Sequence, residues 1–145
     1  MQVVNDVYPT DPKQIEAMRA PGPQGPIVMV NLLKFREKAQ YPDGRDAHLS
    51  GREAYMRYGV EVTKLLVKFG GRAIFAGDVT HLALGRVEEL WDEIALAEYP
   101  NRGALLAMSS SPEWRAIAVH REAGLAGQLN IETTYMGGFQ PKTKA

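Results

Sequence analysis

The sequence predicts an α+β protein with an antiparallel sheet, and three observations support this fold class. Strand-like and helix-like stretches follow one another in the order strand, helix, two strands, helix, strand. Both main helical stretches begin at a serine that can act as a cap, Ser50 and Ser111. The last strand-like run, 129–136, alternates apolar and polar residues as a half-exposed strand does. This order, βαββαβ, is that of the ferredoxin-like unit.

A short N-terminal helix precedes this unit. Thr10 or Asp11 can cap it, and Pro12 suits its first turn because proline fixes a helical φ and needs no hydrogen bond there. The run Pro21-Gly22-Pro23 ends the helix. We therefore expect a helical extension over 12–19 that packs on the rest of the chain.

The first strand is expected over 26–35, where both faces are mostly apolar, as in a central strand covered on both sides. Because side chains alternate along a strand, one face carries Ile27, Met29, Asn31, Leu33 and Phe35, and the other carries Val28, Val30, Leu32 and Lys34. Asn31 is the only amide in this apolar run.

A long polar connection, 36–49, follows the first strand. Connections of this length are often lids or binding loops, and a mobile surface excursion is the alternative. Ser50 and Glu53 then form a capping box, the pattern in which each side chain bonds the other residue's backbone. The helix that starts there carries apolar residues at helical spacing and ends at Gly70-Gly71.

The remaining elements follow from the same signals of alternation, caps and turns. We expect a strand over 72–76, a turn at 77–78 with a bent or hairpin continuation over 81–84, a strand over 91–99, a short helix over 102–108 capped by Asn101, a helix over 111–122, and the strand over 129–136.

Length and composition indicate one globular domain. The chain has 145 residues, 45% hydrophobic and 23% charged, with seventeen basic and seventeen acidic side chains. We expect a core over 26–136, an N-terminal extension over 1–25 and a loose tail over 137–145. The balanced charge predicts no nucleic-acid partner, and the absence of a long apolar run or a leader predicts a cytoplasmic protein without a membrane span. The lack of cysteine excludes disulfides and thiolate chemistry.

Once these elements are placed, the chain resembles the uncharacterised branch of the dimeric α+β barrel superfamily. The resemblance spans roughly residues 10–135 and is carried by segments 30–36, 50–55, 70–72, 91–96, 99–100 and 111–114 together with His120-Arg121. It implies a ferredoxin-like fold in which the sheets of two subunits pair into a closed barrel. It brings no established activity, because the superfamily includes cofactor-free oxygenases, isomerases, cyclases, haem-degrading enzymes and proteins without known chemistry.

The haem-degrading relatives combine an asparagine of the first strand with a tryptophan and a histidine near the second helix. Asn31 matches the first of these positions, but the other two fall near Met108 and Ala118. We therefore expect no haem. The three histidines are scattered without metal-ligand spacing, so we expect no metal and no other cofactor.

Two candidate catalytic residues stand out, Asn31 and His120. Asn31 can orient a carbonyl or phenolate, or be a structural amide that bonds backbone or a nearby tyrosine. His120 can act as a general base, or lie at a helix C-terminus as a favourable cation. Candidate substrate-binding residues are Tyr55, Tyr58, Arg72, Tyr99 and Arg121, for which core packing of the rings and surface ion pairs of the arginines are the alternatives.

The sequence thus predicts a protein that binds a small molecule between sheet and helices, either as a cofactor-independent enzyme or as a ligand-binding or assembly protein without catalysis. It also predicts a homodimer. The sheet face that the helices leave uncovered carries apolar groups from several strands, and a soluble monomer rarely exposes so large a patch.

Overall fold

A computed structural model describes residues 6 and 9–139 of the chain. The elements in chain order are α1 (Pro12–Arg19), β1 (Ile27–Phe35), α2 (Gly51–Lys68), β2 (Arg72–Asp78), β3 (Glu93–Tyr99), α3 (Arg102–Ser109), α4 (Pro112–Gly124) and β4 (Leu125–Thr133). The segment 140–145 of the expected tail and residues 1–5, 7 and 8 of the expected extension lie outside the described residues.

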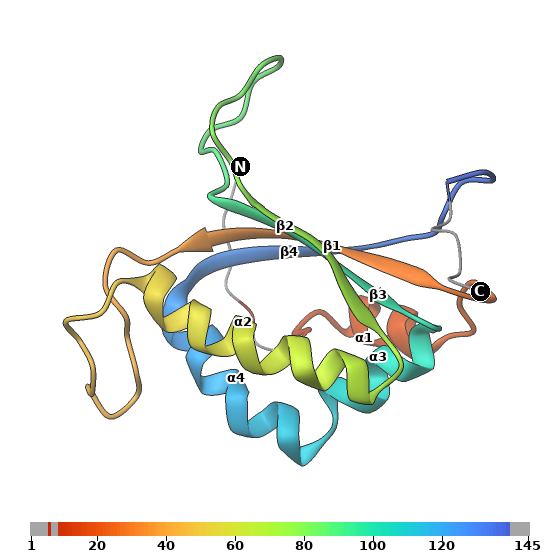
Figure 1. Cartoon of the computed structure of the whole chain (residues 1–145), viewed down its shortest axis with the longest axis horizontal. Helices are drawn as coiled ribbons and strands as arrows, with labels where there is room; N and C mark the ends of the chain where they lie inside the picture. Colours follow the sequence, from red (N-terminus) through yellow and green to blue (C-terminus); the bar gives the residue numbers. More distant parts are fainter. Residues whose placement is uncertain (1–5, 7–8, 140–145) are drawn as a thin grey trace.

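The four strands form one sheet in the order β2-β3-β1-β4, and every neighbouring pair is antiparallel. Figure 1 shows the helices on one side of this sheet, with α2 and α4 lying side by side beneath it. The order, the antiparallel pairing and the one-sided helices confirm the predicted ferredoxin-like α+β fold and its N-terminal helical extension.

The core lies between the sheet and the helices. Ile27 and Met29 of β1 pack there against Tyr58 and Leu66 of α2 and Trp114 of α4. All five side chains are less than 10% exposed. The predicted division of β1 into two faces is therefore confirmed, because this core takes the odd-numbered residues.

Local capping signals place the helix starts. Asp11 accepts from the backbone of Lys13 at the start of α1, and Ser50 and Glu53 form the expected capping box at α2. Asn101 and Ser111 cap α3 and α4 in the same way. These bonds satisfy backbone N–H groups that have no partner within the helix, so short sequence patterns were sufficient to find them.

Several expected strand boundaries were wrong. The turn expected at 77–78 lies within β2, β3 begins at Glu93 and not at residue 91, and β4 ends at Thr133 and not at residue 136. The segment 81–84 is not a strand, because the pairing of β2 with β3 ends after the bond from Val79 N to Asp92 O and the loop beyond projects past the sheet (Figure 1). Leu84 is 91% exposed there, so the segment has no surface on which to pack. The last strand begins at Leu125, directly after α4, and Gly127 lies within it opposite Lys34.

The second face of the sheet, which we call the open face, has no helix over it (Figure 1). Strand register places Val30, Leu96 and Ile131 on it side by side. Phe75, Leu129 and Ile131 are between 39% and 54% exposed, although they are large and apolar. No helix within the described part of the chain is long and apolar enough to cross a membrane.

Candidate functional site

Asn31 lies in the middle of β1 on the side of the helices. Its side-chain nitrogen donates to two backbone carbonyls, Met29 O at 3.3 Å and Ala95 O at 3.2 Å. Its side-chain oxygen accepts from Nε2 of Gln128 at 2.7 Å. The structural interpretation of Asn31 therefore accounts for its nitrogen, while its oxygen connects β1 to a polar residue of β4.

Gln128 extends this contact to Arg121 of α4. Nη2 of Arg121 donates a short hydrogen bond to Oε1 of Gln128 and a second one, of 2.9 Å, to the backbone carbonyl of Asp6. Arg121 is only 8% exposed, and its Nη1 is buried without a hydrogen-bond partner. We call Asn31, Gln128 and Arg121 the polar cluster. It joins β1, β4 and α4 between the sheet and the helices.

Two tyrosines of α2 lie near the polar cluster. The ring of Tyr55 packs against Phe35 and Tyr58, with 5.4 Å between ring centres in both pairs. Burial raises the pKa of both phenols well above the usual value, and the nearby positive charge of Arg121 opposes that rise. Both side chains therefore stay protonated at neutral pH and act as hydrogen-bond donors, not as bases.

Tyr58 has a further contact that ties the site to the core. Nε1 of Trp114 donates to its hydroxyl oxygen at 3.1 Å. The hydroxyl proton of Tyr58 remains available to an acceptor, because a phenol can accept and donate at once.

Glu93 is a titratable residue that sequence reasoning missed. It stands opposite Leu33 in the β1–β3 register, on the side of the helices, and its charge raises the pKa of Tyr55 further. The pKa of Glu93 itself is raised, and burial is the largest cause. The charge of Arg52, 3.7 Å away, opposes this rise, and the charge of Asp78 adds to it. Glu93 is therefore a better proton acceptor than an ordinary surface carboxylate.

The structure does not bring His120 to the polar cluster. Nδ1 of His120 lies 2.6 Å from the hydroxyl of Tyr41, in the connection between β1 and α2. Arg57 donates to the same hydroxyl at 3.3 Å and to Asp46 at 2.9 Å. These contacts hold the connection against α2 and α4. Burial is the largest cause of the lowered pKa of His120, and the charges of Arg57 and Arg45 add to it.

Two other candidates also lie apart from the polar cluster. Arg72 pairs with Glu98 at 2.8 Å, and strand register places this pair on the open face. Tyr99 is 5% exposed within the core, and burial raises its pKa. Of the seven residues predicted, Asn31, Tyr55, Tyr58 and Arg121 thus lie near one another on the helical side of the sheet, where Tyr99 packs in the same core as Tyr58.

Gln128 and Tyr41 had no distinctive sequence signal. Gln128 precedes the expected start of its strand, and its contact with Asn31 joins residues 97 positions apart. The alternation that continues through Asn130 and Glu132 would have found Gln128 if the strand had been extended towards the N-terminus. Tyr41 lies in a connection without periodicity.

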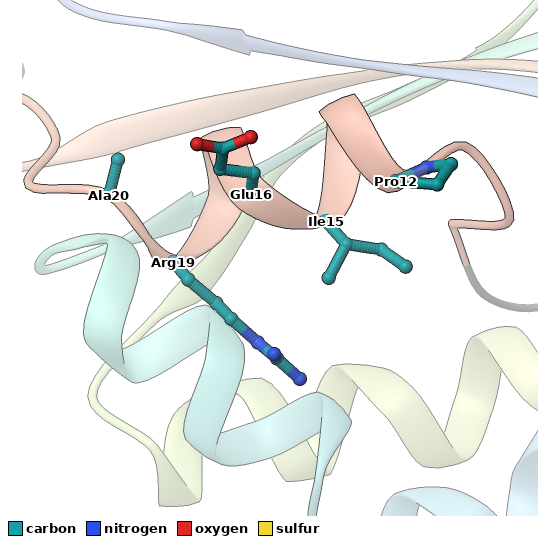
Figure 2. A pocket seen from close by; sticks show the side chains of 5 residues that line it. All are labelled: Pro12, Ile15, Glu16, Arg19 and Ala20. Atoms are coloured by element: carbon teal, nitrogen blue, oxygen red, sulfur yellow. The ribbon is translucent and has the colours of Figure 1, made fainter.

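Two hollows occur elsewhere on the described surface. Figure 2 shows the first, a hollow of about 560 Å³ along α1, lined by Pro12, Ile15, Glu16, Arg19 and Ala20. The second, of about 260 Å³, lies on the open face between Val28, Leu96 and Phe139. Neither is lined by the polar cluster. No group of three metal-ligating side chains is found among residues 6 and 9–139.

Comparisons with known proteins agree with this architecture. The model of a family described as a domain of unknown function, DUF1330, matches residues 46–133. The crystal structure of methylated RPA0582 protein is 31% identical with a TM-score of 0.81, covering 93% of this chain and 98% of that one. Another RPA0582 structure, a protein of unknown function from Rhodopseudomonas palustris, is 30% identical with a TM-score of 0.80, covering 92% and 98%.

A more distant structure shares the fold alone. It is a protein of unknown function from Bacteroides fragilis, described as dimeric and ferredoxin-like, that is 14% identical with a TM-score of 0.52 and covers 76% of this chain and 96% of its own. No match was found among curated proteins.

Proposed function

The chain belongs to the DUF1330 family, a domain of unknown function, and on this premise we propose that it binds a small molecule between its sheet and its helices. The observation that carries the proposal is the polar cluster. Asn31, Gln128 and Arg121 form a connected set of hydrogen bonds between the sheet and the helices, and one donor of that set is buried without a partner. Buried polar groups are normally satisfied, so an open donor indicates a missing partner.

The alternative is an assembly protein in which these side chains are structural. The two backbone bonds of Asn31 favour that interpretation. Arg121 opposes it, because a purely structural arginine at 8% exposure gains nothing from a donor left unsatisfied. Small-molecule binding therefore accounts for more of the cluster than assembly does.

A cofactor-independent enzyme is the catalytic form of this proposal. Glu93 favours it, since a carboxylate with a raised pKa beside protonated phenols resembles a proton acceptor placed next to donors. In this form Glu93 takes the role of base that the sequence assigned to His120. The tyrosines orient the substrate, and Asn31 holds Gln128 in position.

We propose further that the protein is a homodimer in which the open faces of two chains meet. The apolar side chains exposed on this face support the proposal, as does the description of the fold-sharing Bacteroides fragilis protein as dimeric. A stable interface of this kind needs about 1,000 Å² or more of buried surface in total.

The binding proposal is tested by NMR titration of the full-length protein with a library of small fragments, both charged and uncharged. We expect some fragments to shift the side-chain amide signals of Asn31 and Gln128. An Asn31→Ala variant should bind those fragments more weakly. Asn101→Ser is the control, because Asn101 caps α3 outside the polar cluster and serine also caps helices; this variant should bind the fragments normally. A library that shifts neither signal contradicts the proposal.

A further inference from the structure

We infer that Arg121 binds the carboxylate of a small organic acid, an inference that rests on the proposed binding site and names the class of its ligand. The starting observation is the surroundings of the guanidinium group. Nη2 has two partners, the amide oxygen of Gln128 and the backbone carbonyl of Asp6, and both are neutral. Nη1 has none. Among the described residues, no carboxylate forms an ion pair with this arginine.

A buried charge without a counter-charge is costly, because transfer out of water removes its hydration. Arg102 shows how this chain treats another sheltered arginine. Its side chain is 18% exposed, and Glu132 binds its Nε and Nη2 in bidentate fashion at 2.7 and 2.6 Å. Arg121 is the more deeply buried of the two and has no such partner among residues 6 and 9–139. A bound ligand anion would give Arg121 the negative charge and hydrogen-bond acceptors that Glu132 gives Arg102.

The geometry favours a carboxylate. The guanidinium edge formed by Nη1 and Nη2 presents two parallel N–H groups, which match the two oxygens of a carboxylate. One oxygen takes the unpartnered Nη1, and the other replaces the Asp6 carbonyl on Nη2. Arg121 is one positive charge, so a singly charged ligand is balanced by it, whereas a dianionic phosphate is not.

The neighbouring rings indicate the rest of the ligand. Tyr55, Tyr58 and Phe35 form a continuous aromatic group, and both phenols remain neutral donors. Such a surface favours an acid with an apolar or aromatic body, since aromatic faces pack with one another and phenol hydroxyls can donate to the carboxylate. The ligand class is therefore a small monocarboxylic acid with a flat apolar part.

The test compares benzoate with benzamide, which has nearly the same shape but no charge. Binding of each to the full-length protein is measured by NMR titration at constant ionic strength. We expect benzoate to bind about tenfold or more tightly than benzamide, because hydrogen bonds between charged groups are the stronger ones. Arg121→Gln should remove this preference. Arg115→Gln is the matched control, because Arg115 is exposed on the same helix, and it should retain the preference.

A measurement on the unaltered chain protects the test against a variant that fails to fold. Formate, the smallest carboxylate, should shift the Nε–Hε signal of Arg121 in a saturable way, and chloride at the same concentration should not. Equal binding of benzoate and benzamide overturns the carboxylate assignment and leaves the proposed binding site standing. Failure of both compounds and of formate to shift any signal of the polar cluster overturns the assignment and, with a silent fragment library, the site itself.

Discussion

The side chains of the polar cluster differ in how much hydrogen-bonding capacity they have left. Asn31 uses both donors on backbone carbonyls, so its remaining role is to position Gln128. The Nη1 group of Arg121 forms no hydrogen bond. In the proposed site, recognition of a ligand therefore depends chiefly on Arg121, although the sequence drew attention first to Asn31. An amide in an apolar strand is visible in a sequence, whereas the missing partner of an arginine is visible only in three dimensions.

The contact between Tyr41 and His120 predicts a pH dependence of stability. The pKa of His120 lies below its ordinary value of 6.5 in the folded protein, so the unfolded chain binds more protons at that site. The contribution of neutral His120 is complete above pH 6.5 and is lost as the pH falls towards the folded pKa. We expect the advantage of the wild type over His120→Gln in urea unfolding to shrink between pH 7.5 and 5.5. A stability advantage that stays constant over this range would show that protonation of His120 does not affect the stability of the folded protein.

A second residue-scale prediction concerns Tyr58. Tyr58→Phe keeps the ring in the core and removes the hydroxyl that accepts from Trp114. We expect a loss of about 1 kcal/mol in the free energy of unfolding, the ordinary net value of one hydrogen bond. Urea unfolding followed by tryptophan fluorescence measures it. An unchanged free energy of unfolding would mean that the bond contributes nothing in the folded state.

At the scale of elements, α2 and α4 approach each other where one begins and the other ends. The nitrogen of Gly51 donates to the carbonyl of Arg36, and Arg36 N donates to the carbonyl of Gly124. A Cβ atom added at Gly51 would lie only 2.6 Å from Gly124 O. This close approach sets the start of α2, and with it the position of Tyr55 and Tyr58 over the sheet.

Gly51→Ala should therefore destabilise the protein, by about 1–3 kcal/mol as for other overpacked sites. Gly59→Ala is the matched control within the same helix, because a Cβ there meets nothing within 4 Å. That change should stabilise the protein by up to about 1 kcal/mol through helix propensity. Thermal and urea unfolding of both variants measure the two effects. Equal effects of the same sign would disprove the close approach.

The elements also show what a sequence can predict. Caps, turns and the faces of β1 depend on neighbours a few residues away, so Ser50, Asn101 and Ser111 were found correctly. The start of β4 was placed four residues late because Gly127 resembles a helix stop, although it is a strand residue beside a register shift. Gln128 can be assigned to the polar cluster only when the pairing of β4 with β1 is known. The sequence therefore predicted only Asn31 on β1 and Arg121 on α4.

For the whole molecule, the alternation in β4 has a consequence for assembly. Its apolar residues Leu129 and Ile131 stand beside Leu32 and Val30 on the open face, while polar Gln128 and Glu132 lie on the side of the helices. A strand of a monomer would turn its apolar residues towards its own core. The pattern of β4 therefore supports the proposed homodimer, in which this apolar face is buried against a second chain.

Burial of the exposed apolar side chains of the open face would favour this association. Phe75 and Ile131 are 54% and 45% exposed in the isolated chain, and complete burial of such a side chain contributes roughly 1.5–3 kcal/mol. In a two-fold arrangement each residue of the face is buried twice, once in each chain. A single charge placed at the centre of the face is then also buried twice, without a partner.

We therefore expect light scattering to give about twice the chain mass of 16.0 kDa for the wild type. Ile131→Glu should give a monomer at micromolar concentration, because two carboxylates would enter an apolar interface. Val67→Glu should remain a dimer, since Val67 is 67% exposed on α2, on the helical side of the sheet. A monomeric wild type would leave the open face exposed to water and contradict the proposed assembly. Dimers of Ile131→Glu as stable as those of Val67→Glu would place the interface on another surface.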